Sequence, residues 1–176
     1  MNIAIIQSRM GSKRLPGKMM KKIGTSTVIE WVIRRLKEKK SINKIILATS
    51  QKKRDAVFLK ISQKLKINFF AGKETDVLSR FVDSVTNIKK ANIIRVCADQ
   101  PFIEPSEIDK LINFYLNKNY DYVCNRQLYS NVYTNGFGAE ILSLNLLRKL
   151  DKLAKNKRLR EHVTLYLREN KKKFKI

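Results

Sequence analysis

Hydrophobic positions along the chain form two kinds of segment that alternate. Short apolar runs rich in Ile and Val are typical of buried strands, and longer segments with apolar residues at helical spacing are typical of amphipathic helices. The runs predicted as strands cover residues 3–6, 44–49, 67–70, 92–96, 120–124 and 137–142, and another begins at 173–176. The segments predicted as helices cover residues 27–39, 55–65, 75–85, 105–117, 144–153 and 159–167.

This alternation predicts an α/β fold with a mostly parallel sheet that helices cover on both faces. The chain has 176 residues, of which 43% are hydrophobic, and this suits one domain with a sizeable core. No repeat or linker-like stretch interrupts the pattern. We therefore expect residues 1–176 to form a single domain.

Polar residues gather in the stretch that follows the first predicted strand, QSRMGSKRLPGK. Two glycines and a proline exclude a helix there. In open α/β sheets, the crevice at the carboxyl ends of the strands is where ligands bind. Glycine lets backbone N–H groups approach an anion, and Arg or Lys side chains can then hold it. The stretch therefore predicts a polyphosphate-binding loop, and the alternative is an ordinary basic surface loop. Its cations are Arg9, Lys13, Arg14 and Lys18.

The loop matches neither of two standard phosphate-binding patterns. Walker A requires four residues between its first Gly and the Gly-Lys pair, followed by Ser or Thr. Here five residues separate Gly11 from Gly17, and Met19 follows Lys18. The G-x-G-x-x-G fingerprint of dinucleotide-binding folds is absent as well.

The segment R-M-G-S-K-R-L-P-G-K does resemble the signature loop of cytidylyltransferases that act on sugars. These include the acylneuraminate and deoxy-octulosonate cytidylyltransferases, and the likeness is greatest to the spore-coat polysaccharide cytidylyltransferase-like proteins. The resemblance implies the nucleotide-diphospho-sugar transferase fold, a Rossmann-like three-layer α/β/α sandwich. It also implies that Arg9, Arg14 and Lys18 hold the phosphates of CTP, with backbone N–H groups near Gly11 and Ser12.

A carboxylate, Asp99, follows the strand at 92–96 in the segment C-A-D-Q-P. Its spacing alone leaves two interpretations open, a cap for the turn at Gln100 and Pro101 or a metal ligand. The resemblance implies that Asp99 binds the catalytic Mg²⁺ and acts with Lys18 and Arg14, although Ala98 replaces the usual Gly. Mg²⁺ suits such a site because it uses few protein carboxylates and shares phosphate oxygens of the substrate.

Two further segments are similar to the family's nucleotide and sugar regions. Gly72, Asp76 and Arg80 lie in G-K-E-T-D-V-L-S-R, a stretch that the resemblance places beside the nucleotide base; an ordinary helix cap is the alternative. Glu140 and the R-E-H-V segment with Arg160 and His162 are implied to meet the sugar. A lone helical histidine is more often structural than catalytic, so this role stays open for His162.

The chain departs from the family pattern in three places. Asn135 and Gly138 stand where relatives carry Asp, so that Glu140 is the carboxylate that remains there. Relatives also continue past the equivalent of Ile176, with a further carboxylate that completes the metal site, and we expect this chain to lack that segment. A catalytically impaired nucleotide- or sugar-binding relative is therefore an alternative to an active enzyme. Without that segment a sheet edge would be exposed, and a homodimer that covers this edge is a further expectation.

The formal charge of +23 favours polyanionic partners such as nucleotides. The cations are mostly scattered lysines with few aromatic residues between them, so a nucleic-acid-binding module is the less favoured alternative. No apolar run reaches the length of a membrane span, and the N-terminus lacks the pattern of a signal peptide. We expect a cytoplasmic protein without a membrane partner, in which isolated Cys97 and Cys124 stay reduced.

Together these features predict a CTP-dependent sugar cytidylyltransferase. It would convert CTP and a sugar or sugar acid into a CMP-sugar and pyrophosphate, with Mg²⁺, in the biosynthesis of surface polysaccharides or other glycans. The sequence does not identify the sugar.

Overall fold

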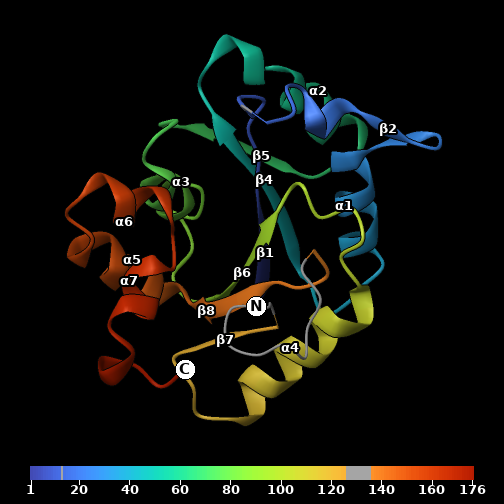
Figure 1. Ribbon diagram of the computed structural model, residues 1–176. Coiled ribbons are helices and arrows are strands. Elements are labelled where there is room, and N and C mark those ends of the chain that lie inside the picture. The colour runs from blue at the N-terminus through green and yellow to red at the C-terminus, as the bar shows by residue number, and fades with distance from the viewer. Residues whose placement is uncertain (13, 126–135) are drawn as a thin grey trace.

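A computed structural model describes residues 1–12, 14–125 and 136–176. Within these residues, six strands form one sheet in the order β5-β4-β1-β6-β8-β7 (Figure 1). The strands β5, β4, β1 and β6 are parallel, β8 runs antiparallel to β6, and β7 pairs with β8. The sheet strands are β1 (Asn2–Gln7), β4 (Lys44–Ser50), β5 (Asn68–Gly72), β6 (Asn92–Cys97), β7 (Tyr122–Cys124) and β8 (Glu140–Ser143), and a separate short hairpin consists of β2 (Lys22–Ile23) and β3 (Ser26–Thr27).

Helices cover both faces of this sheet (Figure 1). The α-helices are α1 (Val28–Lys37), α2 (Val57–Lys64), α3 (Val77–Asp83), α4 (Pro105–Asn117), α5 (Leu144–Leu153), α6 (Lys157–Glu161) and α7 (Leu165–Glu169). Three short 3₁₀ helices are also described, η1 (Lys18–Met20), η2 (Lys53–Asp55) and η3 (Lys171–Lys173).

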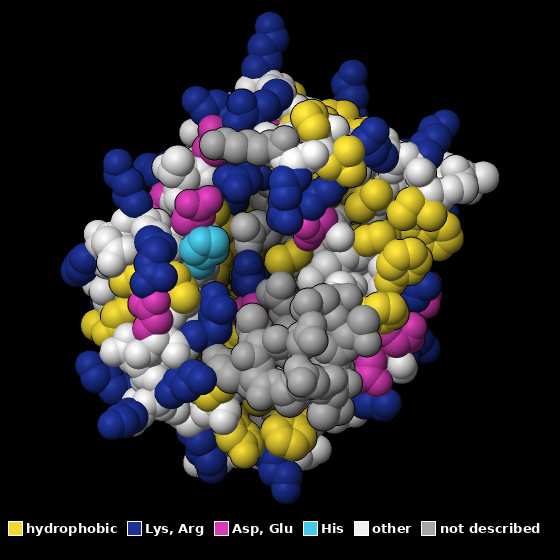
Figure 2. Space-filling view, viewed as in Figure 1, with side chains coloured by type: hydrophobic (Ala, Val, Ile, Leu, Met, Phe, Trp, Pro, Cys, Tyr) yellow, Lys and Arg dark blue, Asp and Glu magenta, His cyan; other side chains and the backbone are white. Residues whose placement is uncertain are grey.

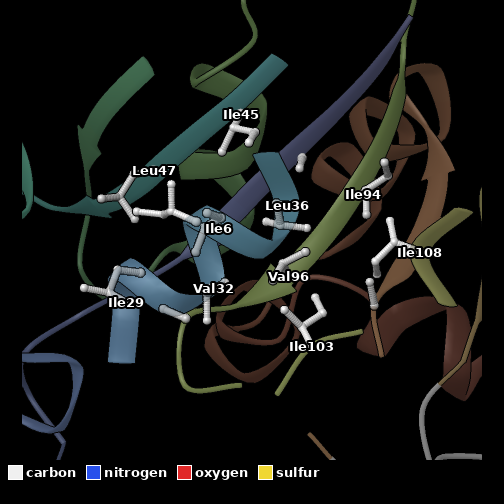
Figure 3. Close-up of a cluster of buried hydrophobic side chains, with 14 of the residues drawn as sticks. Ile6, Ile29, Val32, Leu36, Ile45, Leu47, Ile94, Val96, Ile103 and Ile108 are labelled. Atoms are coloured by element: carbon white, nitrogen blue, oxygen red, sulfur yellow. The ribbon is translucent and has the colours of Figure 1, made fainter. Parts of the chain in front are cut away.

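The central strand β1 shows why two separate cores form. Successive side chains of a strand point to opposite faces of the sheet. Ala4 and Ile6 join the core under α1, α2 and α4, which Figure 3 shows in part, whereas Ile3 and Ile5 join the core under α3, α5 and α7. All four side chains are fully buried. The three-layer α/β/α arrangement and the mostly parallel sheet predicted from the sequence are confirmed.

Apart from shifts of one or two residues at element ends, the unpredicted β2–β3 hairpin and the short 3₁₀ helices, three segments differ from the sequence prediction. The last strand starts at Glu140 and not at residue 137. The helix expected over 159–167 is divided into α6 and α7, because His162 leaves the helical conformation and the next two residues, Val163 and Thr164, turn into the interior. Residues 171–173 form η3, and the chain end pairs with β7 only through the backbone of Lys175, so no strand forms there.

Helix α1 begins with a capping box formed by Thr27 and Glu30. The Thr27 side chain accepts from the Glu30 N–H, and the Glu30 carboxylate accepts from the Thr27 N–H at 2.8 Å. Lys64 of α2 donates to the same carboxylate at 2.7 Å. The hydrogen bond from Lys64 and the bond from the Thr27 backbone lower the pKa of Glu30 from 4.5 to about 2.

This depressed pKa predicts a defined dependence of stability on pH. The ionised Glu30 stabilises the fold above its unfolded-state pKa near 4.5, and the contribution is lost as pH falls toward the folded-state value of about 2. We expect Glu30→Gln to lower the free energy of unfolding at pH 7 by on the order of 2–3 kcal/mol. Denaturant unfolding at several pH values checks this, and a difference between variant and wild type that stays constant from pH 7 to pH 2 would contradict it.

Candidate active site

A cleft of about 700 Å³ opens at the carboxyl ends of β1 and β6. Figure 2 shows Lys and Arg side chains gathered with Asp and Glu side chains around a hollow in this face. The strand order reverses beside β1, because β4 and β5 lie on one side of it and β6 lies on the other. The cleft lies at this reversal. The cleft is lined by Gln7, Ser8, Arg9, Gly11, Ser12, Arg14, Lys18, Met19, Arg54, Glu74, Thr75, Cys97, Asp99 and Glu161.

The first loop is fixed to the sheet by a buried carboxylate. Asp55, which is fully buried, accepts from the Met10 N–H at 2.7 Å and from the Ser50 hydroxyl at 2.5 Å. Further along the loop, Gly17 has a φ of 67° as the chain enters η1, a left-handed conformation that glycine adopts without strain. These contacts hold the loop over the ends of β1 and β4.

Three ion pairs neutralise much of the charge in the cleft. Lys18 Nζ lies 2.5 Å from Asp99 Oδ2, Arg9 lies 3.5 Å from Glu161, and Arg54 pairs with Glu74. All six side chains are partly exposed, and such pairs contribute little net stability. A polyphosphate entering the cleft could therefore replace the carboxylates at small energetic cost.

The structure brings the predicted phosphate-binding residues together. Arg9, Gly11, Ser12, Arg14 and Lys18 all line the same cleft, and so does Asp99 from the far side of β1. Lys13, the remaining cation of the predicted loop, lies outside the described residues.

The Asp99 carboxylate fits a magnesium ion that shares its coordination with a nucleotide. Its side chain is 40% exposed and lies in the cleft beside the phosphate-binding loop. Among the described residues, no group of three or more His, Cys, Asp or Glu side chains could hold a metal by itself. Mg²⁺ commonly uses one or two carboxylates together with phosphate oxygens and waters, so a site of this kind requires the bound nucleotide.

The residues predicted to lie near the nucleotide base are just behind the cleft wall. Gly72 and Arg80 are buried, and a Cβ at Gly72 would lie 3.2 Å from Arg80 Cγ. Burial lowers the pKa of Arg80 to about 10, and the charge of Asp55 partly offsets this effect. Asp76 caps α3 by accepting from the Ser79 N–H at 2.9 Å. Glu74 and Thr75, which lie between Gly72 and Asp76 in the chain, line the cleft. Gly72, Asp76 and Arg80 are not among its lining residues, so their contact with the base stays a prediction.

Arg160 connects the start of α3 to the end of α5 through hydrogen bonds. Arg160 donates to Asp76 at 2.7 Å, to the Asp151 carboxylate at 2.6 Å, and to the carbonyl oxygens of Asp151 and Ala154. Partial burial raises the pKa of Asp76, but the hydrogen bonds from Arg160 and Ser79 outweigh this and lower it below its ordinary value. These bonds use four of the five N–H donors of Arg160, and a sugar contact by this residue stays a prediction.

The other predicted sugar-binding residues occupy different surroundings. His162 is exposed at the end of α6, next to Glu161, which lines the cleft. Glu140 is 1% exposed, and it accepts from Arg95 at 2.5 Å and from the Thr164 hydroxyl at 2.7 Å. Direct contact of Glu140 with a sugar stays a prediction that this buried position does not favour.

The departure at Gly138 has a steric explanation. A Cβ there would lie 1.9 Å from the Asn125 carbonyl oxygen, so no side chain fits without a backbone shift. Asn135, the other position at which the family pattern has Asp, lies outside the described residues.

Sequence reasoning missed several residues that line or support the cleft. Gln7 and Cys97 end β1 and β6, so the strand prediction with the rule for parallel sheets could have identified them. Arg54 and Asp55 have no such signal, because they reach the loop from η2, far along the chain.

Comparison with known proteins places the chain in a family. The model of the cytidylyltransferase family matches residues 3–176. An uncharacterized protein of Methanocaldococcus jannaschii is 37% identical over 174 residues, which cover 99% of this chain and 70% of that protein. The spore coat polysaccharide biosynthesis protein SpsF of Bacillus subtilis is 32% identical over 173 residues, which cover 94% of this chain and 69% of SpsF.

A solved structure gives the same result. The cytidylyltransferase from Leptospira borgpetersenii superposes with a TM-score of 0.90 at 30% identity, over 99% of this chain and 74% of that chain. The resemblance seen in the first loop and the predicted fold class are both confirmed. The chain therefore belongs to the cytidylyltransferase family, whose members are nucleotidyltransferases.

Proposed function

We propose that this chain is a CTP-dependent sugar cytidylyltransferase that serves the biosynthesis of a surface polysaccharide or another glycan. The supporting observation is that one cleft, at the carboxyl ends of β1 and β6, holds the cationic loop and Asp99 in a member of the cytidylyltransferase family. A sugar hydroxyl oxygen would attack the α-phosphorus of CTP in line and lose its proton to solvent. The bond from the α-phosphorus to the bridging oxygen would break, and pyrophosphate would leave.

Catalysis of this kind depends mainly on positioning and on neutralising charge. Arg9, Arg14 and Lys18 would bind the phosphate oxygens, and N–H groups near Gly11 and Ser12 would add hydrogen bonds. Asp99 would hold Mg²⁺, which neutralises charge on the α-phosphate and the leaving group when it is bound. Lys18 Nζ lies 2.5 Å from the same carboxylate, and it would donate to an oxygen of the triphosphate.

The sugar and the catalytic competence of the chain are decided by a screen for pyrophosphate release. Each of the four nucleoside triphosphates is tested with a panel of sugar acids that includes acylneuraminates and deoxy-octulosonates. We expect release with CTP and at least one sugar acid, and loss of release when EDTA removes Mg²⁺. Tight CTP binding without pyrophosphate release for any pair of nucleotide and sugar acid would favour a catalytically impaired relative. Gly138 supports this alternative, because it leaves no room for the carboxylate that the family pattern has there. A cytoplasmic location, where CTP is available, would fit either outcome.

The variant Asp99→Asn separates a metal ligand from a turn cap. Asn keeps the shape and capping ability of Asp but lacks the charge that Mg²⁺ requires. We expect the melting temperature to change little, whereas Mg²⁺ should no longer strengthen CTP binding in calorimetry. A lower melting temperature with unchanged Mg²⁺ dependence would instead assign Asp99 to the turn.

The variant Lys18→Gln tests the triphosphate contact. Loss of a charged hydrogen bond costs about 1–3 kcal/mol, so CTP should bind at least fivefold more weakly. Affinity for CMP should change much less, because CMP lacks the β- and γ-phosphates. Lys60→Gln, which removes an exposed lysine of α2 outside the cleft, is the matched control. Equal CTP affinity in the two variants would exclude Lys18 from the phosphate site.

A further inference from the structure

A layer of polar side chains lies beneath the cleft, on the sheet face that α3, α5 and α7 cover. Arg95 of β6 donates from Nε and Nη2 to Gln7 Oε1 at 3.3 and 3.1 Å, and from Nη1 to Glu140 Oε1 at 2.5 Å. The other oxygen of Glu140 accepts from Thr164 at 2.7 Å. The layer therefore connects the end of β1, through β6 and β8, to the turn between α6 and α7.

The chemistry of arginine fixes which way the Gln7 amide points. A guanidinium has N–H donors and no acceptor, so the group that faces it must be the amide oxygen of Gln7. The NH₂ group then lies on the other branch of the amide, and Gln7 lines the cleft. Among the hydrogen bonds between described residues, none has the Gln7 NH₂ group as donor.

Glu140 keeps this orientation in place. Its carboxylate is almost completely buried and binds Arg95, which is itself largely covered. A buried guanidinium requires such a partner, because an unpaired charge in the interior is strongly destabilising. Fixed between Glu140 and Gln7, Arg95 has little freedom to let the amide rotate.

Gln7 also lies at the end of β1 where a nucleotide is expected to bind. It pairs in register with Cys97 of β6, at the point where the strand order reverses. Ligands of open α/β sheets bind in the crevice at this point. If the triphosphate of CTP lies on the loop that starts at Ser8, the nucleoside monophosphate part is the part nearest Gln7.

We propose that Gln7 is a nucleotide-binding residue, which donates from its NH₂ group to an oxygen of the cytidine monophosphate part of CTP. Arg95 and Glu140 are positioning residues that hold the amide in the donating orientation. This inference rests on the proposed function. It gives Glu140 a role behind the cleft in place of direct contact with the sugar.

The variant Gln7→Met removes the donor at nearly constant side-chain volume. We expect calorimetry to show that CMP and CTP both bind about fivefold to tenfold more weakly, as is typical for the loss of one hydrogen bond. The equal loss for the two nucleotides distinguishes Gln7 from Lys18. Unchanged CMP affinity in the folded variant would overturn the inference. If Gln7→Met does not fold, Gln7→Glu keeps the acceptor for Arg95 but lacks the donor, and retained CMP affinity in that variant would overturn it equally.

The positioning role is tested by replacing the ion pair as a unit. Arg95→Gln with Glu140→Gln leaves no buried charge without a partner. We expect CMP affinity to fall by a factor similar to that for Gln7→Met, and adding Gln7→Met to the pair should cause less than a further twofold loss. Fully multiplicative losses would show that the ion pair does not act through Gln7.

Two controls separate this inference from general effects. Lys64→Met removes the partner of another buried carboxylate, Glu30, away from the cleft. It should lower stability without changing CMP affinity. A wild-type chain that binds neither CMP nor CTP would overturn the proposed function and this inference together, whereas wild-type binding that Gln7→Met leaves intact would overturn only the inference.

Discussion

The hydrogen bond from the Met10 N–H to the buried Asp55 carboxylate fixes the geometry on which the cleft depends. Asp55 follows β4, and it also binds Ser50 at the end of that strand, so the first loop is tied to the carboxyl end of the strand next to β1. The cations of the loop therefore have defined positions over the end of β1. The position of Asp99 does not depend on this hydrogen bond. Asp99 follows β6, which is parallel to β1 and ends on the same side of the sheet.

The distribution of charge matters more here than its total. The chain carries a formal charge of +23, yet the described cleft combines four cations (Arg9, Arg14, Lys18 and Arg54) with three carboxylates. The carboxylates pair with three of the cations at the cleft, and under the proposed function the triphosphate of CTP would replace them. Beneath them, the buried ion pair between Glu140 and Arg95 orients the uncharged amide of Gln7. The site thus combines exchangeable charge at its surface with a fixed hydrogen-bond donor at its floor.

The sequence predicted the parts of this arrangement that depend on local pattern. Strand β1 and the loop from Arg9 to Lys18 both follow from residues that are close in the chain. The role of Asp55, the pairing of Arg54 with Glu74 and the burial of Glu140 depend on contacts between distant segments, which no local pattern encodes. The break between α6 and α7 was missed for the same reason, because Thr164 turns inward to reach Glu140 of β8.

The central claim is that the cleft binds the triphosphate of CTP through its exchangeable cations. The most direct test is the ratio of the affinities of the unmodified chain for CTP and for CMP, measured by calorimetry in the presence of Mg²⁺. Two further phosphate groups that each form charged hydrogen bonds should make CTP bind at least about twenty-five-fold more tightly. Equal affinities for CTP and CMP would show that the cations of the cleft do not hold the triphosphate, and would contradict this account.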